Sequence, residues 1–300
     1  MTPLLLTLSA ALGADIVAPG ICDASAAALV DGALLVTNDE DASLHRYTLT
    51  GQPIGRVALG ADDVELDLEG AALSGERVWW TGSLGNNKRG EPRPERGLLI
   101  ATSPGGEALG RVELREPLLA YPATSALLSG AAALPPKAGG LNVEGLAADP
   151  SGRLWLGLRS PLDARGRAAL IRLDAPAQLL TGASPVFSAV ELVDLGGRGV
   201  RSLTWWSAAG AWLILAGPTD GDGDFALYRW AGAAQAPSPV AADLSGFSPE
   251  GMEFLPSGEL LLLSDDGRVD RSGRDCKDRW KDDPADPEVY FRMRVLTLTL

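Results

Sequence analysis

Glutamate followed by glycine recurs at three places in the chain, Glu69-Gly70, Glu144-Gly145 and Glu250-Gly251. Each pair opens a short apolar run that leads through a polar turn into a second apolar run. Carboxylate oxygens are hard ligands that suit calcium or magnesium. Carboxylates that share a narrow site repel one another unless a cation, an arginine or a raised pKa compensates them. The spacing therefore predicts an acidic site, with each glycine letting the backbone turn inward beside its glutamate.

The same sequence pattern, called the repeated phrase below, occurs five times. Its copies begin at Ser25, Glu69, Glu144, Arg201 and Glu250. Each copy reads as an apolar strand, a turn, a stronger apolar strand, a polar loop and a third strand, and most copies are followed by an outer strand. Self-similarity of this kind is typical of a β-propeller. We predict one all-β domain over residues 1–300 with five blades. A sixth, degenerate blade within an insertion at residues 116–140 is the alternative.

The last copy ends at the C-terminal residues 290–300 without an outer strand of its own. The apolar segment Leu4–Leu8 could supply that strand, which would close the ring by pairing N- and C-terminal strands and remove exposed sheet edges.

The first strand of a propeller blade lines the central channel and the second strand runs back beside it, so the start of one and the end of the other share a mouth. Asp67 points to the same side as Glu69 by the period-two rule. The predicted metal ligands are Glu69, Glu144, Glu250 and Asp265. The other predicted ligand-binding residues are Asp39, Glu40, Asp67, Arg159, Arg201 and Asp266.

Three functions fit this arrangement. In the first, the mouth binds a small ligand or a divalent cation, with calcium as the candidate cofactor. In the second, the protein is a metal-assisted hydrolase, and Arg159 and Arg201 hold an anionic group such as a phosphate. In the third, the pairs Glu144–Arg159 and Glu250–Arg201 are structural salt bridges of a scaffold. The chain has no nucleophile elbow, phosphate loop or zinc-type cysteine cluster, so whether it is an enzyme stays open.

The net charge of −13 argues against nucleic acid and anionic lipid as partners, and no segment is apolar for the ~20 residues that a membrane-spanning helix needs. A small-molecule or anionic ligand fits, and a protein partner is left open. The single histidine, His45, excludes a multi-histidine metal site. Cys22 and Cys276 are predicted to be separate thiols; the alternative is one bridge that closes a polar lid, residues 267–287, onto the first blade.

Several of these segments resemble the signatures of a bacterial family of unknown function, and the resemblance spans nearly the whole chain. The segments are Asp67–Gly70, Asn142–Leu146, Leu158–Pro161, Pro249–Met252 and Ser264–Gly267. More distantly, the Glu-Gly signatures are similar to those of esterase-like phytase propellers. That resemblance implies a calcium-dependent phosphoesterase activity.

Overall fold

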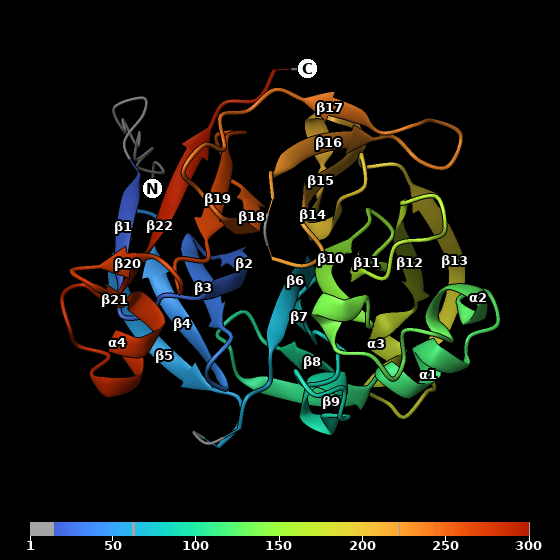
Figure 1. The fold of residues 1–300 in the computed structure, drawn as a ribbon, viewed down its shortest axis with the longest axis horizontal. Coiled ribbons are helices and arrows are strands. Elements are labelled where there is room, and N and C mark those ends of the chain that lie inside the picture. The colour runs from blue at the N-terminus through green and yellow to red at the C-terminus, as the bar shows by residue number, and fades with distance from the viewer. Residues whose placement is uncertain (1–14, 62–63, 222, 300) are drawn as a thin grey trace, which may run out of the picture.

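The structure is a computed structural model, and it describes residues 15–61, 64–221 and 223–299. Five four-stranded antiparallel sheets stand around a central axis, with the strands β2, β6, β10, β14 and β18 innermost (Figure 1). The predicted five-bladed propeller is confirmed.

The first four blades each take their strands from one continuous stretch of chain. Blade one consists of β2 (Ala24–Val30), β3 (Ala33–Asn38), β4 (Ser43–Thr48) and β5 (Pro53–Ala58). Blade two consists of β6 (Leu68–Ser74), β7 (Arg77–Gly82), β8 (Leu98–Thr102) and β9 (Ala108–Glu113). Blade three consists of β10 (Asn142–Ala148), β11 (Leu154–Ser160), β12 (Ala168–Asp174) and β13 (Val186–Val193). Blade four consists of β14 (Gly199–Trp206), β15 (Ala211–Gly217), β16 (Ala226–Trp230) and β17 (Ser238–Val240).

Blade five joins the two ends of the chain. It consists of β18 (Pro249–Phe254), β19 (Leu260–Ser264), β22 (Tyr290–Leu296) and β1 (Ile16–Pro19). β1 pairs antiparallel with β22, and Arg294 Nε lies 2.7 Å from Asp15 Oδ1 beside this seam. Closure by N- and C-terminal strands is therefore confirmed, with Ile16–Pro19 as the outer strand. The segment predicted for that role, Leu4–Leu8, lies outside the described residues.

The remaining elements are short and lie between strands. Between β9 and β10 come α1 (Arg115–Ala120), α2 (Ser125–Leu128) and the 3-10 turn η2 (Pro136–Ala138), and the described residues form no sixth blade there. The others in the blades are η1 (Pro94–Gly97), α3 (Pro176–Leu179) and η3 (Ser207–Ala209). Between β19 and β22 come β20 (Asp270–Arg271), β21 (Arg274–Asp275) and α4 (Cys276–Asp282). Residues 267–289 are called the α4 segment below.

The hydrophobic core lies between the blades. Every residue of β3, β15 and β19 is buried, because a second strand is packed on both faces by neighbouring blades. Trp79 and Trp80 are fully buried in this way. The tryptophans therefore stabilise blade packing. In the described part of the chain, no helix is long and apolar enough to cross a membrane.

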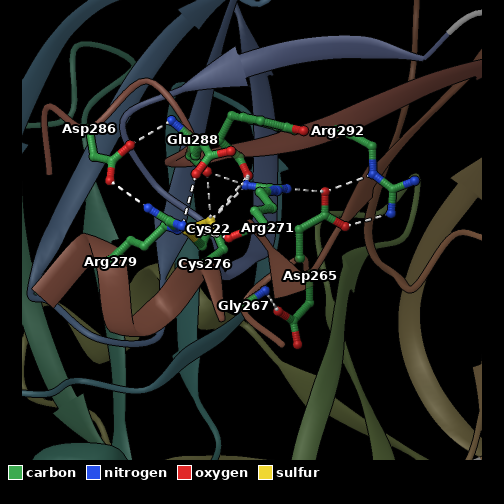
Figure 2. Close-up of a disulfide and its surroundings, with 11 residues drawn as sticks. Cys22, Asp265, Gly267, Arg271, Cys276, Arg279, Asp286, Glu288 and Arg292 are labelled. Atoms are coloured by element: carbon green, nitrogen blue, oxygen red, sulfur yellow. Dashed lines mark hydrogen bonds and ion pairs between the residues drawn. A yellow bond between two sulfur atoms is a disulfide. The ribbon is translucent and has the colours of Figure 1, made fainter. Parts of the chain in front are cut away.

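Cys22 and Cys276 form a disulfide, with their Cα atoms 5.9 Å apart across 254 positions of sequence (Figure 2). The prediction of two separate thiols was wrong. The propeller closes on itself, and this brings the residue before blade one beside the loop that leaves blade five. The bond fastens the α4 segment to the start of blade one.

Candidate functional site at the channel mouth

A β-bulge marks the start of the first strand in all five blades. In blade two, Leu68 pairs with Gly82 and Gly70 with Thr81, so Glu69 is an extra residue in the ladder. The equivalent shifts contain Glu144, Arg201 and Glu250, and the shift in blade one contains Ser25 together with Ala26. A bulge bends the strand and re-aims the side chain of the extra residue. The five repeat-start residues are thus set apart from the regular ladder by one repeated backbone device.

The glycines after these residues have a packing role. A Cβ on Gly70 would lie 2.7 Å from Leu146 Cβ, and a Cβ on Gly145 would lie 2.8 Å from Val200 Cγ1. Neither glycine has the positive φ at which glycine is favoured. The expected turn of the backbone is supplied by the bulge, and the glycine instead allows the next blade to approach.

One half of the mouth is an ion-pair network, which we call the arginine half: Glu144, Arg159, Arg201 and Glu250. Glu144 is 2% exposed and lies 2.8 Å from Arg159 Nη1 and 3.0 Å from Arg201 Nε. Arg201 also pairs with Glu250, and Asn142 Nδ2 donates to Glu144 at 2.9 Å. Burial lowers the pKa of Arg201. Burial also lowers the pKa of Arg159, but the carboxylate of Glu144 outweighs it and the net pKa is raised.

The other half carries unpaired carboxylates, which we call the acidic half: Asp23, Asp39, Glu69 and Asp265. Thr37 Oγ1 donates to the carbonyl of Leu68 at 3.0 Å, and this bond joins the end of β3 to the start of β6. Asp39 accepts a hydrogen bond from Ser25. Burial, followed by the charges of Asp67 and Asp23, raises the pKa of Asp39 well above its usual range.

The pKa of Glu69 is shifted in the same direction as that of Asp39. Burial raises its pKa well above the usual range, and the charges of Asp39 and Glu144 raise it further. Within the described ranges, neither Asp39 nor Glu69 forms an ion pair with a lysine or arginine. The raised pKa values of Asp39 and Glu69 therefore have burial and neighbouring carboxylates as their cause.

The backbones of Asp23 and Asp265 form an isolated antiparallel β-bridge, which joins the start of blade one to blade five. Asp23 is 5% exposed, and burial together with the charge of Asp265 raises its pKa to about 8. Its Oδ2 is buried without a hydrogen-bond partner among the described residues. Asp265 accepts from Gly267 N at 2.8 Å (Figure 2), and a side chain at Gly267 would overlap the Asp23 carboxylate. Sequence reasoning missed Asp23, because it precedes the repeated phrase.

Glu40 and Asp67 have basic partners from two loops, the α4 segment for Glu40 and η1 of blade two for Asp67. Lys277 pairs with Glu40, and Lys281 Nζ lies 2.8 Å from Glu40 Oε2. Burial raises the pKa of Glu40, but these two lysines outweigh it and the net pKa is lowered. Asp67, at a left-handed φ of 51°, lies 3.1 Å from Arg96 Nη1. Burial outweighs that arginine and raises the pKa of Asp67.

Asp266 does not join the mouth. It is completely buried and accepts from Arg292 Nη2 at 2.7 Å and from Arg271 Nη2 at 3.1 Å. Its neighbour Asp265 points away from both arginines (Figure 2). The other nine predicted residues are linked to one another by ion pairs or by the electrostatic interactions that shift their pKa values.

The four predicted metal ligands are divided between the two halves. Glu144 and Glu250 are held by arginines, whereas Glu69 and Asp265 stand in the acidic half. Among the described residues, no three His, Cys, Asp or Glu side chains are placed so that they could hold a metal ion together.

Comparison with known families places the chain. A family described as "Protein of unknown function (DUF3616)" matches residues 107–256, half of the sequence. The chain belongs to the DUF3616 family. The matched residues run from β9 to the end of blade five's first strand and include Glu144, Arg159, Arg201 and Glu250. No curated protein matches this DUF3616 member in sequence.

Solved structures show what the DUF3616 fold is similar to. Glutaminyl cyclase from Myxococcus xanthus matches with 13% identity and a TM-score of 0.50, covering 96% of this chain and 97% of that one. A catalytically inactive virginiamycin B lyase from Staphylococcus aureus matches with 12% identity and a TM-score of 0.39, over 84% of this chain and 65% of that one. A protein of unknown function from Bacteroides caccae matches with 11% identity and a TM-score of 0.37, over 83% and 69%. At these identities the similarity to the cyclase shows the fold alone.

The raised pKa of Asp23 gives a testable dependence of stability on pH. Between its ordinary pKa of 3.8 and its folded value of about 8, the folded protein keeps a proton that the unfolded chain has lost. Stability contributed by this group therefore falls as the pH rises through that window. We expect Asp23→Asn to gain stability relative to the wild type by a few kcal/mol between pH 4 and pH 8, measured by urea unfolding.

Asp163 is the control for this experiment, because hydrogen bonds from Arg167 lower its pKa to about 2. Asp163→Asn should show no gain over the same range. A difference between wild type and Asp23→Asn that does not change with pH would contradict the assignment of a proton to Asp23.

Proposed function

We propose that the channel mouth binds a cation, either a divalent metal ion or a cationic small ligand, and that the acidic half is the binding group. The observation that carries this proposal is the pair Asp39 and Glu69, two carboxylates that form no ion pair with a lysine or arginine among the described residues and whose pKa values are raised. Binding of a cation would lower both pKa values and so release protons.

The charge balance of the mouth supports a cationic ligand. Its carboxylates are Asp23, Asp39, Glu40, Asp67, Glu69, Glu144, Glu250 and Asp265. Its basic side chains are Arg96, Arg159, Arg201, Lys277 and Lys281. Eight carboxylates face five basic groups, so the mouth is negative when all of them are ionised. A low-dielectric channel with an excess of one sign concentrates ions of the other sign.

Calcium is the first ion to test, because backbone carbonyls and waters can complete its coordination, so that two carboxylates are enough where three do not converge among the described residues. Binding is favoured over phosphoester hydrolysis. Arg159 and Arg201, which would have to hold the anionic group of a substrate, are already engaged by Glu144 and Glu250.

The test is isothermal calorimetry on chelator-treated protein at pH 6 in two buffers that differ in ionisation enthalpy. We expect saturable calcium binding with release of protons, and we expect Glu69→Gln to weaken the affinity at least about tenfold. The matched control is Glu253→Gln. Glu253 also lies in an innermost strand, and burial raises its pKa to about 8, but no charged neighbour contributes to that shift.

Loss of calcium binding in Glu69→Gln with full binding in Glu253→Gln supports the proposal. A wild type that binds neither calcium, magnesium nor methylammonium would refute it.

A further inference from the structure

We infer that the α4 segment is an autoinhibitory cap, in which the ammonium groups of Lys277 and Lys281 stand in for the ligand cation and must leave before it binds. This inference rests on the proposed cation site. It adds a device that regulates access to that site.

The two lysines lie one helical turn apart on α4 and share one carboxylate. Both reach Glu40 at the end of blade one's second strand. The backbone fixes the start of the helix, since Lys277 N donates to the Gly267 carbonyl at 3.0 Å and Cys276 N to the Val269 carbonyl at 3.1 Å. The α4 segment therefore carries two positive charges to the edge of the acidic half.

Lys277 interacts with the acidic half as well as with Glu40. Burial lowers its pKa, but the hydrogen bond to Glu40 and the charges of Asp23, Glu40 and Asp39 outweigh burial, and the net pKa is raised. The same ammonium opposes the rise in the pKa of Asp23, which burial and the charge of Asp265 still raise to about 8. A positive charge at this place is what a bound cation would supply, so the chain provides its own substitute.

The lysines do not satisfy all of the polar groups beside them. Asn38, which is 1% exposed and precedes Asp39, has no hydrogen-bond partner for either amide atom within the described ranges. Asp23 Oδ2 is likewise buried without a hydrogen-bond partner among these residues. Buried polar atoms are normally paired, so these groups indicate a ligand or water that the capped arrangement does not replace.

The disulfide places the cap with respect to the site. Cys22 is the neighbour of Asp23, and Cys276 is the neighbour of Lys277, so the disulfide (Figure 2) joins the residue before a carboxylate of the site to the residue before an ammonium of the cap. When the cap opens, the disulfide keeps the α4 segment tethered beside the site.

The α4 segment is tied to blade five by Arg271, which donates to Asp266 at 3.1 Å and to the Tyr290 carbonyl at 2.6 Å, whereas its outer part is held by contacts within the segment. Cys22, Cys276 and Val289 form a small apolar cluster with Trp280, apart from the blade cores. Arg279 pairs with Asp286 and Glu288 within the segment itself. A cavity of about 470 Å³ separates Pro284–Pro287 from the blade-one side chains of His45 and Tyr47. The segment is therefore an internally braced unit with free space beneath its outer end.

The inference predicts that removing the two ammonium groups strengthens calcium binding. Loss of two positive charges beside the site should raise calcium affinity about tenfold or more in Lys277→Met/Lys281→Met, measured by calorimetry at low salt. Lys88→Met removes a charge from an exposed loop and is the matched control, with wild-type affinity expected. In the wild type, saturating calcium should also increase hydrogen exchange of the amides of residues 276–282.

The outcomes separate the cap from the site beneath it. If the double variant binds calcium with wild-type affinity, or if calcium leaves exchange in α4 unchanged, the cap is wrong while the cation site stands. If the double variant binds calcium about tenfold more tightly than the wild type, and calcium increases exchange in wild-type α4, the cap is supported. If neither protein binds calcium, magnesium or methylammonium, the cation site fails and the cap fails with it.

Discussion

Replacing Glu144 by glutamine is expected to lower the free energy of unfolding by about 3–5 kcal/mol. Glu144 is the carboxylate that Arg159 and Arg201 share. Without it, Arg201 keeps its ion pair with Glu250, but Arg159 has no other ion pair among the described residues. Breaking a buried pair is costly because the remaining charge stays away from water without a partner, whereas glutamine keeps the shape and one acceptor.

Urea unfolding of wild type and Glu144→Gln measures this loss. The matched control is Asp282→Asn, which removes a carboxylate that is 68% exposed and pairs with Arg274 at the surface. That change should cost less than about 1 kcal/mol. Adding Arg159→Gln to Glu144→Gln should recover part of the loss, because it removes the unpaired charge. A loss below about 1 kcal/mol in Glu144→Gln would show that the arginine half contributes little to stability.

Removing the disulfide, by Cys22→Ala together with Cys276→Ala, is expected to lower the free energy of unfolding by about 2–5 kcal/mol. The bond joins residues 254 positions apart, so it constrains nearly the whole unfolded chain. Both cysteines are completely buried, so the native protein should also resist reduction by dithiothreitol until it opens. Urea unfolding of the double variant, beside oxidised wild type, measures the effect.

Two results would contradict this expectation. Equal stability of the double variant and the oxidised wild type would mean that the bond does not constrain the unfolded chain. Rapid reaction of the native protein with dithiothreitol would mean that the α4 segment leaves the sulfur atoms accessible.

The blade-forming parts of the mouth could be predicted from sequence, because each blade repeats its phrase in register. Glu69, Glu144 and Glu250 stand at the same position of that pattern, and the fold places them at equivalent positions in three different blades. Which carboxylate pairs with which arginine could not be predicted. Arg201 reaches back to Glu144 and forward to Glu250 across two blade interfaces, and these distances depend on blade tilt.

The errors lie where the chain leaves the repeat. Asp23, Lys277 and Lys281 belong to segments outside the repeated phrase, so no register places them. The disulfide has no local signal either, since only closure of the ring brings Cys22 to Cys276. Asp266 follows Asp265 directly, and successive residues of an extended chain point to opposite sides, so the two could not both face the mouth.

The repeated bulge has a consequence for how such a protein can change. An extra residue in the ladder can be substituted without shifting the pairing of the residues on either side of it. The chain already places serine, glutamate and arginine at this one kind of position. The side chains at the five bulges can therefore be exchanged one blade at a time, by evolution or by design, without a change in strand register, provided that each buried charge keeps a partner.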